Sequence, residues 1–469
     1  MKKTKIAIVG AGSAGLTAAR LAAQFGIDVT LFEKGNIGGD CLHTGCVPSK
    51  SMISVANKIR EARRLEKLGI RTSGNISFET IKKYIRGSIN HIHAREDSAA
   101  ALKKLGVKIV SEKVVFDSPS SLKTASGTKY QFKKCIVATG SQPKTMSIEG
   151  VDSSELLTSD TIWNMSVMPK NLVIVGGGVI AVELAGAFAS FGVQVTIVET
   201  NKNLLPNLDY EMSQAALDGL KGQGVKLLLN AKVKSASKQT KYKVVVSTQS
   251  KTETFEADKI LVAIGREIRL DDLNLQKAMV EHTDCITVDN LQRTSNKNIF
   301  AAGDCVGPPF FTHLAGEQGA NALLNAAFHS RRKINKGALP WTIFSYPEIA
   351  HVGKLKRDLE KDHVSFKEEL LHFGDTDKAT VDRESGGASL LIDKRGRLLG
   401  ASIIGAHASE LIGYYTYLIG KKRKLKDFAG VMQNYPTMTQ ALRQHAADMR
   451  IKRSSKSVVI NIYLKLRGY

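Results

Sequence analysis

Apolar and small residues near the start of the chain form a strand–turn–helix–strand pattern. The stretch KIAIVGAGSAGLTAARLAAQFGIDVTLFEK opens with an apolar strand, passes Gly10, Gly12 and Gly15 into a helix, and ends with a strand that reaches Glu33. This is the spacing of a dinucleotide-binding unit: two glycines allow a tight turn and the approach of a pyrophosphate, and the third allows close helix–strand packing. If the pattern occurred only once, a glycine-rich turn that binds no ligand would be the alternative explanation.

The same pattern recurs in NLVIVGGGVIAVELAGAFASFGVQVTIVET, where Gly176, Gly178 and Ala181 take the fingerprint positions and the second strand ends at Glu199. In both copies the helix N-terminus would face the phosphates, and the acid could accept a hydrogen bond from a ribose hydroxyl. An acid here suits a free 2′-hydroxyl and would repel a 2′-phosphate, which favours NADH over NADPH. Lys202 lies close enough in sequence to weaken that preference.

Two shorter stretches also place small residues after an apolar strand. KKCIVATGSQPK leads into Thr139 and Gly140, and IFAAGDCVG leads into Gly303 and Asp304. A nucleotide-sized ligand could approach the backbone at such strand ends. Ordinary buried strands that end in turns explain these stretches equally well.

The stretch GGDCLHTGCVPSK places Cys41 and Cys46 five positions apart. On a regular helix this spacing separates the Cα atoms by roughly 8–9 Å, whereas a disulfide needs about 4.4–6.8 Å. The segment before Cys46 must therefore turn, and Gly45 can supply unusual dihedrals. Pro48 suits a first helical turn, so a helix is predicted to begin here and to continue through SKSMISVANKIREARRLEKLG.

Cys46 is therefore predicted to lie at a helix N-terminus, where the helix dipole and nearby Lys50 favour a thiolate. A disulfide framework is disfavoured because the chain has only five cysteines. A zinc site would need two more ligands at a matching spacing, and no second pair of this kind occurs. The pattern predicts a redox-active cysteine pair.

The composition is that of a globular protein of several domains, with 469 residues, 43% hydrophobic and 24% charged. The formal net charge of +23 could attract anionic cofactors, membrane surfaces or nucleic acid. No basic recognition motif interleaved with aromatic residues appears, so a generally basic surface is favoured and no nucleic-acid partner is expected.

The first residues, MKKTKIAIVGAGSAGLTAARLAA, imitate a signal peptide, but their glycine spacing fits a strand–turn–helix better. Arg20 and Glu183 interrupt the two best apolar stretches before either reaches the roughly 18 residues of a membrane span. A cytoplasmic location is therefore expected. The basic and apolar segment RIKRSSKSVVINIYLKLRGY could make a weak contact with an anionic membrane surface. A solvated, partly ordered C-terminus is the more common outcome for such a segment.

Taken together, these motifs resemble the class I flavin-dependent pyridine nucleotide–disulfide oxidoreductases, which include dihydrolipoamide dehydrogenase, glutathione reductase and the core of mercuric reductase. The resemblance runs nearly end to end. It implies an α/β fold with two Rossmann-like dinucleotide-binding domains and a C-terminal α+β dimerisation domain. The implied domains are FAD-binding at 1–150 and 270–337, NAD(P)-binding at 151–269, and an interface domain at 338–469. The family is a homodimer whose active sites combine both chains.

The resemblance also implies individual roles. Cys46 would be the thiolate over the flavin and Cys41 the exposed thiol that attacks substrate. Lys50 would lie near the flavin and pair with Glu183, which makes physical sense because an unpaired charge in an apolar helix is costly; a solvent-facing Glu183 is the alternative. The implied cofactor contacts are Gly10, Gly12, Gly15, Glu33, Lys50, Thr139, Gly140, Gly303 and Asp304 for FAD, and Gly176, Gly178, Glu199 and Gly265 for the nicotinamide cofactor.

The sequence departs from the family where disulfide-reducing members carry a His-Pro and a glutamate that orients the histidine. In NYPTMTQALRQ, Tyr435 stands at the histidine position and Gln440 at the glutamate position. Tyrosine has a reference pKa of about 10 against about 6.5 for histidine. Tyr435, the remaining candidate catalytic residue, is thus a poor base that can still donate a hydrogen bond. His445 and His313 are better explained as packed or surface histidines.

Three functions remain open. A dihydrolipoamide dehydrogenase-like enzyme would pass electrons from NADH through flavin and the Cys41–Cys46 pair to a small disulfide-type acceptor. A mercuric, other metal-ion or quinone-type reductase would use the same centre without a strong acid–base partner. A flavoprotein that acts as a redox sensor or scaffold is the third. Mercuric reductase also has a tyrosine in this region, but its C-terminal cysteine pair has no counterpart in this sequence.

Overall fold

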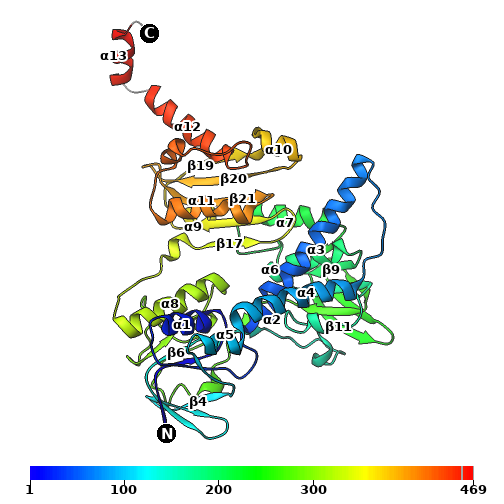
Figure 1. Ribbon diagram of the computed structural model, residues 1–469. Helices are drawn as coiled ribbons and strands as arrows, with labels where there is room; N and C mark the ends of the chain where they lie inside the picture. Colours follow the sequence, from blue (N-terminus) through cyan, green and yellow to red (C-terminus); the bar gives the residue numbers. More distant parts are fainter. Residues whose placement is uncertain (456–457, 468–469) are drawn as a thin grey trace. The chain divides into compact units, whose positions relative to one another are not determined.

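A computed structural model describes residues 1–455 and 458–467 (Figure 1). The chain divides into two compact units. The first joins Met1–Lys202 to Gln223–Ile334, and the second joins Asn203–Gly222 to the residues from Asn335 onward.

The largest sheet among the described residues of the first unit has seven strands. It consists of β1 (Lys2–Val9), β2 (Val29–Phe32), β3 (Lys108–Val110), β4 (Val114–Ser118), β5 (Ser121–Thr124), β6 (Lys129–Val137) and β16 (Ile299–Ala301). The order is β3-β2-β1-β6-β5-β4, with β16 paired to β6. Strands β1, β2, β3, β6 and β16 run parallel, so their carboxyl ends meet at one edge.

Helices α1 (Ser13–Gln24) and α8 (Thr312–Phe328) pack together beside this sheet. They share a buried core with its strands, to which Ile8, Leu31 and Leu323 belong. A Cβ on Gly319 would lie 2.1 Å from the carbonyl oxygen of Ala14. The small residues of both helices therefore allow their backbones to approach closely.

A second parallel sheet in this unit has the order β10-β9-β8-β14. Its strands are β8 (Asn171–Val175), β9 (Gln194–Val198), β10 (Lys226–Leu228) and β14 (Lys259–Val262). Helix α6 (Val179–Ser190) connects β8 to β9 and is apolar on nearly every side, as expected of a helix that is buried all round. Five more strands complete the unit: β11 (Lys232–Lys238), β12 (Tyr242–Ser247) and β13 (Thr252–Ala257) in one antiparallel sheet, and the short pair β7 (Gln142–Pro143) and β15 (Arg266–Glu267).

Four helices lie between β2 and β3: α2 (Gly39–His43), α3 (Cys46–Leu65), α4 (Phe78–Ile92) and α5 (Ala99–Lys104). Ser77 and Ser98 begin α4 and α5 as N-caps, since each hydroxyl accepts a hydrogen bond from a backbone amide three residues later. Helix α3 packs against α6 and α4.

The second unit is built on an antiparallel sheet of order β17-β18-β21-β20-β19. Its strands are β17 (Pro340–Ile343), β18 (Ile349–Gly353), β19 (Lys367–His372), β20 (Gly386–Ile392) and β21 (Leu398–Gly405). Its helices are α7 (Tyr210–Gly222), α9 (Lys356–Lys361), α10 (Asp377–Asp382), α11 (Ala408–Gly420), α12 (Gln440–Ser455) and α13 (Val458–Leu466). The stretch GRLLGASIIGAHASELIG folds as β21, a turn and α11.

Helix α7 joins the second unit although in sequence it lies between β9 and β10 of the second parallel sheet. Just before α7, the carboxylate of Asp209 accepts hydrogen bonds from the amides of Lys356 (2.9 Å) and Arg357 (3.1 Å) at the start of α9. A Cβ on Gly219 would lie 2.1 Å from the carbonyl oxygen of Tyr346. Close packing therefore fixes α7 against this unit.

The predicted fold class is confirmed: two parallel dinucleotide-type sheets are followed by a C-terminal α+β unit. In the described residues, no helix combines the length and the apolar character needed to cross a bilayer. Within the basic C-terminal segment singled out above, positions 456–457 and 468–469 lie outside the described residues.

Candidate active site

The two cysteines lie on successive helices. Cys41 belongs to α2, and Cys46 is the first residue of α3. The chain turns between them, where the amides of Thr44 and Gly45 both donate to the carbonyl oxygen of Asp40, at 2.9 and 2.6 Å. Gly45 has a φ of −108°, outside the left-handed region. Space explains the glycine instead, because a Cβ would lie 3.1 Å from that same Asp40 oxygen.

The two sulfurs are present as free thiols. A hydrogen bond from Cys41, a second one from Thr312, and the charge of Lys50 lower the pKa of Cys46 to about 6, against the opposing effect of burial. The Cys46 Sγ lies 3.2 Å from the Thr312 Oγ1. The hydrogen bond to Cys46, together with burial, raises the pKa of Cys41. At neutral pH the pair is therefore a Cys46 thiolate beside a protonated Cys41.

Lys50 lies one helical turn after Cys46 on α3. Its Nζ is 2.7 Å from the Oε2 of Glu183 on α6, and the Glu183 side chain is only 4% exposed. A buried carboxylate in an apolar helix is costly unless a cation compensates its charge. This ion pair therefore joins α3 to α6 and fixes an ammonium group one turn from the thiolate.

A polar network that the sequence did not reveal surrounds the cysteine loop. Arg266 lies 3.0 Å from the Asp40 carboxylate and donates through Nε to the Ser141 Oγ at 2.8 Å. The Ser141 hydroxyl in turn donates to Asp304 Oδ2 at 2.6 Å. Burial raises the pKa of Asp304, while Ser141 and Arg266 oppose that rise. In the sequence, only the position of Arg266 directly after Gly265, at the end of a strand, could have indicated this network.

Thr312 is the second residue that sequence reasoning missed. It begins α8, whereas the neighbouring His313, which the sequence singled out, stacks on the ring of Phe311 with 5.4 Å between centroids. The hydroxyl nearest the thiolate is thus one position before the histidine. A hydroxyl at a predicted helix start was the available signal.

The glycines of the first fingerprint have different reasons to be glycine. Gly10 has a φ of +104°, and a Cβ there would lie 2.3 Å from the carbonyl oxygen of Ala138. A Cβ on Gly15 would lie 1.9 Å from the Gly10 oxygen, whereas Gly12 has nothing within 4 Å of its Cβ position. The protein itself requires Gly10 and Gly15, and Gly12 leaves the open space that a pyrophosphate needs.

The second fingerprint repeats this arrangement. Gly176 has a φ of +109°, and its Cβ position lies 2.5 Å from the carbonyl oxygen of Ala263, while Gly178 again faces open space. Ala181, in the third position, is fully buried. This unit therefore also has room for a dinucleotide at the turn.

The other predicted contacts follow neighbouring strand ends. Gly140 and Gly265 have φ angles of +73° and +118°, and neither has an atom within 4 Å of its Cβ position. Thr139 is exposed. Gly303 has a φ of +81°, and a Cβ there would lie 3.2 Å from the Cβ of Ala14 at the start of α1. These loops lie at the carboxyl ends of β6, β14 and β16, where dinucleotides bind in open α/β sheets.

Glu33 and Glu199 make the same internal hydrogen bonds. Glu33 accepts from the amide of Ala11 at 2.7 Å through Oε2, and Glu199 accepts from the amide of Gly177 through Oε2. In both cases Oε1 accepts from the amide two residues after the acid, at 2.7 Å. Each carboxylate thus holds its fingerprint turn against the loop after the second strand. The Oε1 of Glu199 also accepts a hydrogen bond from the Asn201 side chain. The Oε2 accepts only the one from Gly177 among the described residues, so it can accept another from a ribose hydroxyl.

The cysteine loop packs directly on the first fingerprint turn. Gly38 and Gly39 both have positive φ angles, and a Cβ on Gly39 would lie 2.8 Å from the Cα of Gly12. Elsewhere in the loop, the Trp163 Nε1 donates to the carbonyl oxygen of Thr44 at 2.7 Å. The redox-active loop is therefore held between a nucleotide turn and an indole ring.

The remaining predicted residues belong to the second unit. Tyr435 is 70% exposed, and its hydroxyl donates to Asp377 Oδ2 at 2.9 Å, which raises the pKa of Tyr435. Gln440 begins α12, and its Oε1 is buried with no hydrogen-bond partner among the described residues. His445 is half-buried, 3.6 Å from the Glu369 carboxylate, and burial lowers its pKa. His445 is therefore a packed histidine, and the raised pKa of Tyr435 keeps its hydroxyl protonated at neutral pH.

Comparisons with known proteins cover nearly the whole chain. Residues 4–319 match the model of the pyridine nucleotide-disulphide oxidoreductase family, and residues 339–446 match its dimerisation domain. The dihydrolipoyl dehydrogenase of Geobacillus stearothermophilus is 32% identical over 453 residues, 95% of this chain and 96% of that protein. That of Chlamydia pneumoniae is 32% identical over 445 residues, 94% of this chain and 95% of that protein.

Solved structures give the same fold. The crystal structure of LpdA from Mycobacterium tuberculosis has a TM-score of 0.86 at 25% identity and covers 95% of this chain and 99% of its own. A copper(II) complex of a variant of the HOCl-induced flavoprotein disulfide reductase RclA from Escherichia coli has a TM-score of 0.84 at 23% identity, with coverage of 95% and 99%. At 23% identity, the similarity to RclA concerns the fold alone.

Proposed function

This chain belongs to the pyridine nucleotide-disulphide oxidoreductase family and is an FAD-dependent enzyme, and we propose that it passes electrons from NADH to the Cys41–Cys46 disulfide and on to a small disulfide-type acceptor. The observation that carries the proposal is the position of Cys46, which begins α3 with its Sγ 3.2 Å from the Thr312 Oγ1. With Cys41 and Lys50 beside it, the pKa of Cys46 falls to about 6. Relatives at 32% identity bear the name dihydrolipoyl dehydrogenase, which supports a dithiol or disulfide substrate.

FAD, when bound, would relay the electron pair from the nicotinamide to the disulfide. With one proton, two electrons convert the Cys41–Cys46 disulfide into the Cys46 thiolate and the Cys41 thiol. The Cys41 sulfur then attacks the acceptor disulfide and forms a mixed disulfide, and the proton of Cys41 passes to the acceptor sulfur that departs as a thiol. Cys46 attacks the Cys41 sulfur, re-forms the internal disulfide and releases the second acceptor sulfur as a thiolate. The helix N-terminus, Thr312 and Lys50 stabilise the Cys46 anion throughout.

The glycine turns support the cofactor assignment because they keep open the space that pyrophosphates need. We assign FAD to Gly10, Gly12, Gly15, Glu33, Lys50, Thr139, Gly140, Gly303 and Asp304, and the nicotinamide cofactor to Gly176, Gly178, Glu199 and Gly265. We assign the FAD domain to 1–150 and 270–337, the NAD(P) domain to 151–269 and the interface domain to 338–469. The sheets support this division, except that α7 packs with the C-terminal unit.

The coenzyme is NADH in this proposal, because the buried Glu199 carboxylate would repel a 2′-phosphate. Steady-state kinetics should give a higher kcat/KM for NADH than for NADPH. An NADPH efficiency about tenfold above that for NADH, equal to about 1.4 kcal/mol, would contradict the assignment.

Tyr435 favours a second candidate, a metal-ion or quinone-type reductase. Its pKa is raised by Asp377, so it cannot take a proton at neutral pH as a histidine would. A metal ion or a quinone has no thiol leaving group, so its reduction does not need a histidine that carries a proton to one. NADH oxidation measured against lipoamide, glutathione disulfide, metal ions and quinones separates the two candidates. Failure with every acceptor would favour the sensor or scaffold.

Restoring the family's pair tests the role of Tyr435. The double variant Tyr435→His/Gln440→Glu should raise turnover of a small disulfide, but by only part of the roughly 10²–10⁴-fold that positioned acid–base catalysis provides. Turnover of quinones or metal ions should stay unchanged. If the unmodified enzyme is already fast on disulfides and the double variant is slower, another group acts as the acid.

A further inference from the structure

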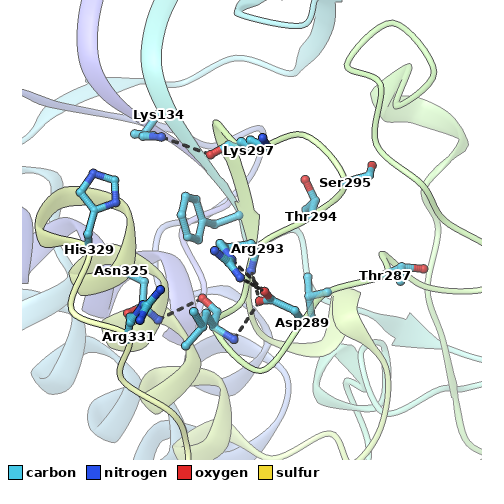
Figure 2. A pocket seen from close by; sticks show the side chains of 13 residues that line it. Lys134, Thr287, Asp289, Arg293, Thr294, Ser295, Lys297, Asn325, His329 and Arg331 are labelled. Atoms are coloured by element: carbon cyan, nitrogen blue, oxygen red, sulfur yellow. Dashed lines mark hydrogen bonds and ion pairs between the residues drawn. The ribbon is translucent and has the colours of Figure 1, made fainter.

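A concave site of 880 Å³ lies in the first unit (Figure 2). Helix α8 begins with Thr312, beside Cys46, and after 17 residues is followed by His329, which lines the site. At 1.5 Å per residue the helix separates the two places by about 25 Å. Lys297 also lines the site and precedes β16, whereas Asp304 follows that strand. The site therefore lies away from the strand ends that face the nucleotides.

The walls are strongly cationic. They carry Lys134, Arg293, Lys297 and Arg331, together with His329, and Asp289 is the one acidic residue among those that line the site. Arg293 pairs with Asp289 at 2.6 Å, which neutralises both charges. Figure 2 shows these side chains coming from β6, the loop before β16 and the end of α8. Three cationic side chains remain without a carboxylate within ion-pair distance in the part of the chain that the structure describes.

Lys134 is the partly buried cation of this site, and its hydrogen-bond partners carry no charge. Its Nζ donates to two uncharged groups, the carbonyl oxygen of Lys297 at 3.1 Å and the Asn298 Oδ1 at 2.9 Å. Partial burial lowers the pKa of Lys134. The ammonium is thus partly desolvated without a counter-charge, and a bound anion would supply one.

The loop that forms one wall is fixed internally. Asp289 Oδ1 accepts hydrogen bonds from the amides of Leu291 (2.8 Å) and Arg293 (3.0 Å), and the Asn325 Nδ2 donates to the carbonyl oxygen of Leu291 at 3.0 Å. The site is therefore preformed, and its volume is in the range of about 300–1,000 Å³ found for small-molecule sites.

Compensation of a helix dipole explains only part of this charge. Cations are favourable near a helix C-terminus, which accounts for Arg331 after α8. Lys134 and Lys297 come from the opposite wall, so the dipole of α8 does not account for them.

We propose that this groove binds a phosphorylated small molecule with at least two phosphate groups. Together, Lys134, Lys297 and Arg331 match a multivalent anion better than a single carboxylate, and Val288 and Leu291 offer apolar contact to its carbon skeleton. The proposal does not depend on which acceptor the cysteine pair reduces.

Calorimetry on the FAD-loaded enzyme tests the proposal. Pyrophosphate and fructose 1,6-bisphosphate are the probes, orthophosphate is the comparison with a single phosphate group, and excess NAD⁺ occupies the coenzyme site. The two diphosphates should bind saturably and more tightly than orthophosphate, and added salt should weaken them. The variant Lys297→Ala/Arg331→Ala should lose at least about tenfold in affinity, which is about 1.4 kcal/mol.

The matched control is Lys103→Ala/Lys104→Ala, which removes the same charge from exposed positions at the end of α5. It should change the affinity by less than about twofold. Equal losses in both variants, or no saturable binding, would overturn the proposal in favour of a general basic surface. Tighter binding of an oligonucleotide of the same charge would overturn it in favour of a polyanion surface. Lys134→Gln, which keeps a hydrogen-bond donor, provides a second test if the double variant does not fold.

Discussion

The pKa of Cys46 is low because of Cys41 and Lys50, which are close in sequence, and Thr312, which is distant. The largest contribution comes from the Cys41 hydrogen bond, and Thr312 and Lys50 add to it. A free cysteine titrates near 8.5. The thiolate is therefore a property of the assembled site and should respond to each neighbour separately.

Substitutions of Cys41 test this. In Cys41→Ser the hydroxyl can still donate to Cys46, so the thiolate should give a long-wavelength absorption with oxidised FAD in the absence of reductant. The thiolate is the deprotonated form, so this band should grow as pH rises, with a midpoint near the Cys46 pKa of about 6, and disappear in more acidic buffer. Cys41→Ala removes the donor and should move the midpoint to higher pH.

Absorbance titration of both variants measures the midpoints. Cys46→Ser should show no band at any pH. A band in that variant would mean that the two cysteines exchange roles.

At the scale of residues, the sequence predicts what is local. The helix start and Lys50 lie within four positions of Cys46, so a thiolate could be inferred from them. Thr312 is 266 positions away from Cys46. Arg266 contacts Asp40, which lies more than two hundred positions earlier in the sequence. Such contacts depend on tertiary packing, which no local pattern encodes.

The ion pair between Lys50 and Glu183 joins two helices, α3 and α6. Lys50→Met should destabilise the folded enzyme because it removes the ammonium from a carboxylate that is 4% exposed. Breaking a fully buried pair costs about 3–5 kcal/mol. The Lys50 side chain is 34% exposed, so we expect a smaller loss in the free energy of unfolding, about 1–3 kcal/mol.

Urea unfolding of the FAD-loaded protein measures this loss. The double variant Lys50→Met/Glu183→Leu should recover much of it, since the buried charge is then gone too. Lys58→Met, at an exposed position of the same helix, should change stability by less than about 0.5 kcal/mol. A loss in Lys58→Met as large as in Lys50→Met would show that the ion pair is not the cause.

Helix α13 exposes most of its apolar side chains, with Val458 at 70%, Ile462 at 53% and Leu466 at 81%. It lies beyond the matched dimerisation domain, which ends at residue 446. Asn461 and Lys465 share one face, four positions apart. The sequence after Asp448 has six basic residues and no acidic one: Arg450, Lys452, Arg453, Lys456, Lys465 and Arg467. An apolar helix between basic flanks is typical of a segment that rests on anionic lipid.

We therefore expect the protein to sediment with vesicles that contain phosphatidylserine at low salt and to be released at high salt. Ile462→Ser should weaken this binding, and Asn461→Ser, on the polar face, should not. Sedimentation that is the same with and without vesicles would show that the tail is solvated or packs on protein instead.

At the scale of elements, the fingerprint units and the helix after Cys46 were predictable because their periodicity and glycines are contiguous. The place of α7 was not. Its contact partner, the start of α9, is about 150 residues further along the chain. Only the folded chain shows that α7 belongs with the C-terminal sheet.

The whole molecule should be a homodimer, since residues 339–446 match the family's dimerisation domain. Light scattering should give about twice the chain mass of 50.9 kDa. If each active site uses both chains, dilution below the dimer dissociation constant should lower the turnover per chain. A monomer of undiminished specific activity would contradict this expectation.

The carboxylates of Glu33 and Glu199 close their turns with hydrogen bonds made inside the protein. The shape of each nucleotide cradle therefore does not depend on the molecule that occupies it. An apoprotein stripped of flavin should keep both cradles and regain colour on simple mixing. Synthetic flavins of altered redox potential should load in the same way, so the thermodynamic driving force of this enzyme can be retuned without changing its sequence.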